Sequence, residues 1–98
     1  MEKLEFDYPS ANRTVSMKAH VGVVGSGDME VLMQPAEKGI AHVSVVTSVN
    51  GFGKSWKAVT DRFFAKHDGA VRIDINDAGA SPGSVMLRLE QAMEEIDQ

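Results

Sequence analysis

Apolar side chains recur along this chain with two different periods, and together these periods restrict the fold more than any other feature. Every second residue is apolar over residues 4–8, 15–24, 29–33 and 71–75. A period of two buries one face of a β-strand and leaves the other in water. Residues 40–47 form a mostly apolar, β-branched run, which favours a strand in the interior of a sheet.

The second period is helical and occupies two stretches in the second half of the chain. The first stripe consists of Phe52, Trp56, Val59 and Phe63. These spacings place all four on one helix face, and Gly69 is expected to close that helix. The second stripe consists of Val85, Leu89, Ala92 and Ile96. Ser81 followed by Pro82 is typical of a helix N-cap and first helical position.

Strands and helices of this kind need one another to bury their apolar sides. Two amphipathic helices beside antiparallel strands predict an α+β fold, a two-layer sandwich in which both helices cover one face of a mostly antiparallel sheet. A chain of 98 residues has the surface for one core. We therefore expect a single domain over residues 1–98.

The net charge of the chain limits the classes of partner that it is expected to bind. With 10 Lys and Arg against 14 Asp and Glu, the formal net charge is −4. This disfavours a nucleic-acid surface and an anionic membrane, both of which recruit clustered basic residues. Residues 1–7 alternate charged and apolar side chains rather than forming a signal peptide, and no apolar stretch is long enough to span a membrane. A cytoplasmic protein is expected.

Metal and thiol chemistry are also disfavoured. The chain has no cysteine, so a disulfide, a thiolate metal site or a cysteine nucleophile is excluded, and any thiol must arrive on an attached group. His20, His42 and His67 lie in three different elements without the i, i+4 spacing of a metal site, and His42 is expected at a strand surface. Asp74, Asn76 and Asp77 are most simply explained as turn and capping residues.

The best candidate for a functional residue is a serine between two glycines. Gly25, Ser26, Gly27 and Asp28 separate the strands expected at 15–24 and 29–33, which predicts a hairpin turn. A catalytic serine needs a base and an oxyanion pocket, and its glycine-flanked elbow joins a strand to a helix rather than two strands. A serine without bulky neighbours on an exposed turn is better suited to being modified by a transferase.

A second glycine-rich segment comes close to a phosphate-binding loop. Residues 48–55 follow a strand and open a helix, but Ser48 stands where the P-loop pattern requires glycine. A nucleotide-hydrolysing domain also needs a larger parallel sheet than this chain can build. The alternative that stays open is a phosphate- or nucleotide-binding module that uses Gly51-Phe52-Gly53-Lys54-Ser55.

Residues 23–32, VVGSGDMEVL, resemble the modified-serine segment of the malonate decarboxylase acyl carrier (delta) subunit. The likeness continues in the same order through residues 45–51, Trp56, and residues 73–77, 79–80, 82–83 and 87–92. The short core Ser26-Gly27-Asp28 is also similar to the citrate lyase acyl carrier (gamma) chain, which is the alternative family. The longer stretch VVTSVNG at 45–51 favours the malonate family.

The resemblance implies a non-catalytic carrier with a covalent group. The hydroxyl of Ser26 would be joined by a phosphodiester to 2′-(5″-triphosphoribosyl)-3′-dephospho-coenzyme A, and Gly25, Gly27 and Asp28 would form the turn that presents it. The thiol of that group would carry acetyl and malonyl between the acyl-transferase and decarboxylase subunits. A holo-carrier transferase and a malonyl transferase are further implied partners. Whether Asp28 orients the serine or closes the turn is left open.

Overall fold

The structure is a computed structural model that describes residues 1–96 except 12, 16, 23–27, 37 and 38, with the backbone alone at positions 10 and 14. Its strands are β1 (Glu2–Ala11), β2 (Arg13–Thr14), β3 (Ala19–Gly22), β4 (Met29–Pro35), β5 (Gly39–Thr47) and β6 (Gly69–Asp77). Its helices are α1 (Gly53–Lys66) and α2 (Pro82–Ile96).

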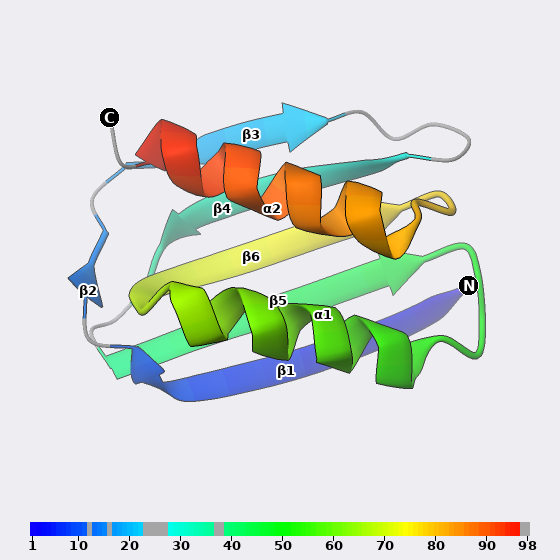
Figure 1. Ribbon diagram of the computed structural model, residues 1–98, viewed down its shortest axis with the longest axis horizontal. Coiled ribbons are helices and arrows are strands. Elements are labelled where there is room, and N and C mark those ends of the chain that lie inside the picture. The colour runs from blue at the N-terminus through cyan, green and yellow to red at the C-terminus, as the bar shows by residue number, and fades with distance from the viewer. Residues whose placement is uncertain (12, 16, 23–27, 37–38, 97–98) are drawn as a thin grey trace.

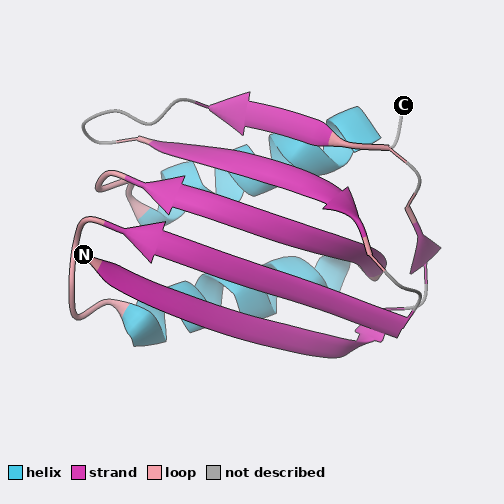
Figure 2. Cartoon of the chain, turned by 180° about the vertical axis from the view of Figure 1, so that it is seen from behind, coloured by secondary structure: helices cyan, strands magenta, loops and turns pink. Residues whose placement is uncertain are grey.

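The strands form one open sheet, and both helices lie on the same face of it (Figure 1). The order across the sheet is β1-β5-β6-β4-β3, and the short β2 also pairs with β6. Neighbours in this order are antiparallel except the central pair β5 and β6, which is parallel. Seen from behind, the sheet lies in front of the helices, and neither helix covers this second face (Figure 2). The predicted α+β sandwich is therefore confirmed.

The core lies between this sheet and the helices. The strands β1, β5, β6, β4 and β3 contribute alternate residues, and their register aligns Leu4, Val45, Ile75, Val31 and Val21 in one row. Helix α2 packs over β3 and β4. It buries the whole predicted stripe and one further residue, namely Val85, Leu89, Ala92, Met93 and Ile96. The N-cap prediction also holds, since the amide of Ser84 donates to the Ser81 hydroxyl over 3.2 Å.

Helix α1 differs from its predicted form at both ends. Phe52 precedes the helix and is 52% exposed, so it is not part of the buried face. Thr60 is buried on this helix instead. Its hydroxyl donates a hydrogen bond of 3.1 Å to the carbonyl of Trp56, so this polar group has a partner within the core. The helix ends at Lys66, and Gly69 starts β6 rather than closing α1. A Cβ at Gly69 would lie 3.1 Å from the side chain of Val15, which explains glycine there by packing.

The strand expected over residues 15–24 was predicted too long. The structure has β2 at Arg13–Thr14 and β3 only from Ala19, while residues 23 and 24 lie outside the described part. Val15 is buried without belonging to a strand. The reason is topological: β2 pairs with β6, whereas β3 lies at the far edge beyond β4, so the chain crosses the end of the sheet between them.

The sheet face turned away from the helices is mostly polar. His42 lies there, as predicted, and its ring contacts the carboxylate of Asp7 on β1. Within the described residues, no helix is long and apolar enough to cross a membrane.

Candidate functional site

One end of the molecule gathers the described residues that flank both glycine-rich segments of the sequence. Strand β3 ends there at Gly22, β4 begins there at Met29, and the parallel strands β5 and β6 end there at Thr47 and Asp77. Both helices also begin at this end (Figure 1). The parallel pair is what brings the two strand-to-helix connections together, because the carboxyl ends of parallel strands share one edge.

The predicted hairpin is present in its two strands. Strands β3 and β4 pair in antiparallel register, with Gly22 opposite Glu30. Three of the four predicted site residues, Gly25, Ser26 and Gly27, lie outside the described residues. The fourth, Asp28, is described, and so are the residues on which both ends of the turn rest.

Gly22 is the last described residue before the turn, and only glycine fits its position. Its φ is +81°, a conformation that residues with a Cβ rarely adopt. A Cβ built on Gly22 would also lie 2.1 Å from the carbonyl oxygen of Met29. The two strands therefore approach at the base of the hairpin more closely than any other residue would allow.

Asp28, on the other side of the turn, is tied to helix α2. Its carboxylate accepts hydrogen bonds from Arg88 at 2.7 and 3.2 Å and from the amide of Met29 at 2.7 Å. These bonds, those from Arg88 first, hold the pKa of Asp28 below its usual range. Its carbonyl oxygen accepts a 2.9 Å bond from the amide of Ala78. Asp28 thus anchors the end of the turn to both the helix and the loop after β6.

Side chains on the sheet face that the helices do not cover also hold the hairpin in place. Glu30 on β4 accepts hydrogen bonds from Asn76 on β6 at 3.1 Å and lies 2.7 Å from the ring of His20 on β3. Its contacts with His20 and then Asn76 lower the pKa of Glu30. Three neighbouring strands are therefore linked through one carboxylate directly below the turn.

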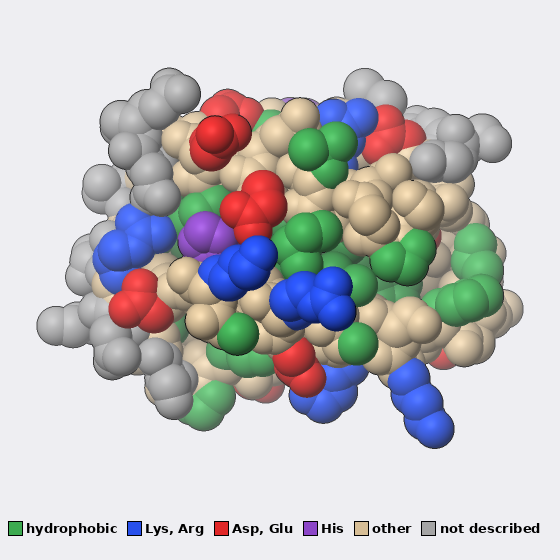
Figure 3. Space-filling view, in the orientation of Figure 1, with side chains coloured by type: hydrophobic (Ala, Val, Ile, Leu, Met, Phe, Trp, Pro, Cys, Tyr) green, Lys and Arg blue, Asp and Glu red, His purple; other side chains and the backbone are tan. Residues whose placement is uncertain are grey.

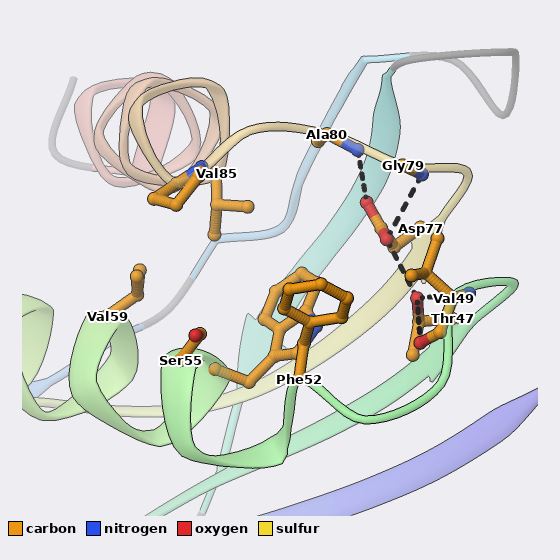
Figure 4. A pocket seen from close by; sticks show the side chains of 11 residues that line it. Thr47, Val49, Phe52, Ser55, Val59, Asp77, Gly79, Ala80 and Val85 are labelled. Carbon is orange, nitrogen blue, oxygen red and sulfur yellow. Dashed lines mark hydrogen bonds between the residues drawn. The ribbon is translucent and has the colours of Figure 1, made fainter.

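A pocket of about 230 Å³ opens at the same end, between the beginnings of the two helices. Its lining is mostly apolar and consists of Val49, Phe52, Trp56, Val59, Ala80, Pro82 and Val85, together with Thr47, Ser55, Asp77 and Gly79. In the space-filling view, apolar side chains reach the surface between the helices and at the end where both helices begin (Figure 3). Figure 4 shows the lining residues arranged around the pocket.

Two polar side chains that line this pocket, Thr47 and Asp77, are hydrogen-bonded within the protein. The Asp77 carboxylate accepts hydrogen bonds from the hydroxyl of Thr47 at 2.8 Å and from the amides of Gly79 and Ala80 at 3.2 and 2.9 Å (Figure 4). These contacts confirm the predicted turn role of Asp77. They leave the apolar walls as the part of the pocket that is available to a ligand. The predicted turn role is wrong for Asp74 and Asn76, which lie within β6 and pair with Arg72 and Glu30.

Comparison with known protein families shows which family the chain belongs to. The family model described as malonate decarboxylase delta subunit (MdcD) matches residues 16–96. The chain belongs to this family.

Relatives of this delta-subunit family match over almost their whole length. The malonate decarboxylase acyl carrier protein of Azotobacter vinelandii is 48% identical over 97 residues, which cover 98% of this chain and 97% of that protein. The protein of the same name from Pseudomonas syringae pv. tomato is 50% identical with the same coverage. The resemblance found in the sequence is thereby confirmed.

A solved structure extends the likeness to the fold. A chain in the crystal structure of a Pseudomonas malonate decarboxylase hetero-tetramer in complex with malonate superposes with a TM-score of 0.93. It is 47% identical, and the match covers 98% of this chain and 99% of that chain. The fold described above is therefore shared with a subunit of that assembly.

The glycine-rich segment at 48–55 has a structural role in this delta-subunit chain. It connects β5 to α1, Gly51 takes a positive φ of 90°, and Phe52 and Ser55 line the pocket. Lys54 is exposed and does not line it. Among the described residues, no group of three or more His, Cys, Asp and Glu side chains is placed to hold a metal ion.

The sequence did not indicate the contacts that fix the hairpin from other elements. Arg88 is 60 positions from Asp28 along the chain, and Asn76 is 46 positions from Glu30. Neither pair follows a local spacing rule. Only the arrangement of strands and helices brings these partners together.

The link between Arg88 and Asp28 should be visible in the pH dependence of stability. Because the folded pKa of Asp28 is lowered, the link stabilises the protein above the ordinary value of 3.8 and is lost as pH falls through the folded pKa. Arg88→Gln should therefore lower the unfolding free energy at pH 7, and its difference from wild type should shrink below about pH 3.8. Urea unfolding at pH 2 to 7 measures this.

Arg72→Gln is the matched control for that experiment. Arg72 pairs with Asp74 at 3.3 Å on the exposed sheet face, where such pairs contribute little. A pH-independent difference for Arg88→Gln, equal to that for Arg72→Gln, would contradict the anchoring role.

Proposed function

We propose that this chain is the acyl carrier subunit of a malonate decarboxylase, a single domain over residues 1–98 that carries acetyl and malonyl thioesters on an arm attached to Ser26. The observation that carries the proposal is the near full-length match to proteins named as malonate decarboxylase acyl carrier proteins. The arm is 2′-(5″-triphosphoribosyl)-3′-dephospho-coenzyme A, joined to the serine oxygen through a phosphodiester.

Two features of the structure suit such a group. The strands on both sides of the turn are held by hydrogen bonds, β4 through Asp28 to Arg88 and β3 through His20 to Glu30. An apolar pocket opens at the same end of the molecule. When bound, the group supplies a terminal thiol that carries the acyl unit as a thioester, chemistry that a chain without cysteine lacks.

In this proposal the residues of this chain present Ser26 and its arm to other proteins. Glycines on both sides of Ser26 leave backbone without side chains for a modifying transferase to enclose. Asp28 and Arg88 fix where the end of the turn lies, so the arm starts from a defined point. Tethering then replaces diffusion of a free thioester with a high effective concentration at each active site that the arm reaches.

Catalysis belongs to the partners in this proposal. The carrier works in the cytoplasm with the acyl-transferase and decarboxylase subunits, the malonyl transferase and the transferase that installs the arm. The solved relative within a malonate decarboxylase hetero-tetramer supports an assembly of this kind.

The decisive test asks which enzyme the carrier serves. The chain is expressed with the arm-installing transferase, acetylated on its thiol, and mixed separately with the catalytic subunits of malonate decarboxylase and of citrate lyase. We expect carbon dioxide from malonate in the first mixture and no citrate cleavage in the second. Citrate cleavage without malonate decarboxylation would instead assign the chain to the citrate lyase carriers, the alternative family.

A further inference from the structure

We propose that the pocket between the beginnings of α1 and α2 is a resting site for the thiol-bearing end of the arm on Ser26. This inference rests on the proposed function, because it takes the arm as the occupant. It adds a binding site on the carrier itself, so that the thioester alternates between this pocket and the partner active sites.

The first argument is the character of the pocket. Ligand pockets are mostly apolar with a few polar groups, and those for drug-sized ligands measure about 300–1,000 Å³. At about 230 Å³ this one is smaller, a size suited to a short acyl thioester and the chain next to it. Phe52 and Val49 at its edge are 52% and 38% exposed, apolar surface that an occupant would remove from water.

The second argument is the position of the pocket relative to the attachment point. Asp28 hydrogen-bonds through its carbonyl to Ala78, and the next two residues along the chain, Gly79 and Ala80, line the pocket. Ser26 precedes Asp28 by two residues, and two residues span at most about 7 Å. An arm fixed to Ser26 therefore starts within about 7 Å of Asp28, which is bonded to the loop that forms one wall of the pocket.

The third argument concerns the groups that the pocket leaves available. Asp77 and Thr47 bond to each other and to backbone amides, so these two polar lining residues are satisfied without a ligand, and Ser55, the other polar side chain of the lining, is exposed. Phe52, Val59 and Val85 come from three directions around the space (Figure 4). An apolar thioester end fits these walls, whereas the phosphate groups of the arm would stay outside in water.

The test blocks the pocket and measures the reactivity of the thiol. Ser55 is an exposed helix residue that lines the pocket, so Ser55→Leu fills the space without disturbing the core. Ala58 is exposed on the same helix but is not part of the lining, so Ala58→Leu is the matched control. Because the chain has no cysteine, a disulfide reagent such as dithionitrobenzoate reports only the thiol of the arm.

We expect the arm's thiol in wild type and in Ala58→Leu to react more slowly than in Ser55→Leu. If the arm occupies the pocket for about four-fifths of the time, the difference is about five-fold. Equal rates in all three proteins, each confirmed by intact mass to carry the arm, would overturn the proposal.

A second measurement keeps the pocket testable without the arm. Trp56 is the only tryptophan of the chain and lines the pocket, so its fluorescence reports occupancy. Free pantetheine added to the unmodified protein should change this emission saturably in wild type and Ala58→Leu but not in Ser55→Leu. A flat titration in wild type would overturn the pocket proposal. A saturable change together with an unmodifiable Ser26 would instead refute the proposed function alone.

Discussion

Replacing Ser26 with alanine should abolish attachment of the arm and leave the fold unchanged. The variant lacks the only oxygen to which we assign the phosphodiester, so intact mass after expression with the transferase should show no added group. The sequence predicts an exposed turn for this position, and surface substitutions change stability by about 0.5 kcal/mol or less. The urea midpoint should therefore match that of wild type.

Ser48→Ala is the control for that result. Ser48 is exposed and follows β5 at the end of the molecule where β4 begins, but nothing assigns it a modification. It should accept the arm on Ser26 as wild type does. An added mass on the Ser26→Ala protein, or its failure to fold, would show that Ser26 is not a simple modification site.

Leu89→Ala should cause the largest loss of stability. Leu89 is 1% exposed in the middle of α2, where it packs into the core between helix and sheet. Truncating a buried leucine removes its burial and leaves a cavity, which costs about 2–5 kcal/mol. With a urea slope of about 1–3 kcal/mol per molar, the unfolding midpoint should fall by on the order of 1 M.

Leu87 provides the comparison on the same helix. It is 56% exposed, so Leu87→Ala makes the same chemical change without opening a cavity. The unfolding free energy should change by no more than about 0.5 kcal/mol. Similar midpoints for the two alanine variants would mean that α2 does not pack on the sheet through the face containing Leu89.

The elements that could be predicted from the sequence are those with a strong apolar period. The stripe of α2 was predicted residue by residue, and its N-cap followed from a local rule about Ser81 and Pro82. The errors lie where tertiary contacts override local signals. The sequence predicts that Gly69 closes α1, but Gly69 begins β6, where a Cβ would make a tight 3.1 Å contact with the side chain of Val15.

The candidate site also has one part that the sequence indicated and one part that depends on tertiary contacts. Ser26 and its neighbours were indicated by turn chemistry and by resemblance, and this assignment stays a prediction. The pairing of Asp28 with Arg88 and the pocket beside Trp56 could not be predicted, because both depend on where α2 lies over the sheet. A periodic pattern shows which face of a helix is buried, but not which strand-end residues its polar side chains meet.

The central place of β6 has a consequence for how the chain matures during synthesis. This strand is the last of the sheet to leave the ribosome, yet it lies between β5 and β4 and joins the pair β1–β5 to the hairpin β3–β4. Until it inserts, these two pairs share no strand contact in the described sheet, and such non-local pairing is slow. Arg88 follows later still. A nascent chain therefore makes its serine early but holds the Asp28 end of the turn only after α2 has been made and has packed, so an enzyme that requires the anchored hairpin would act only after β6 and α2 have folded.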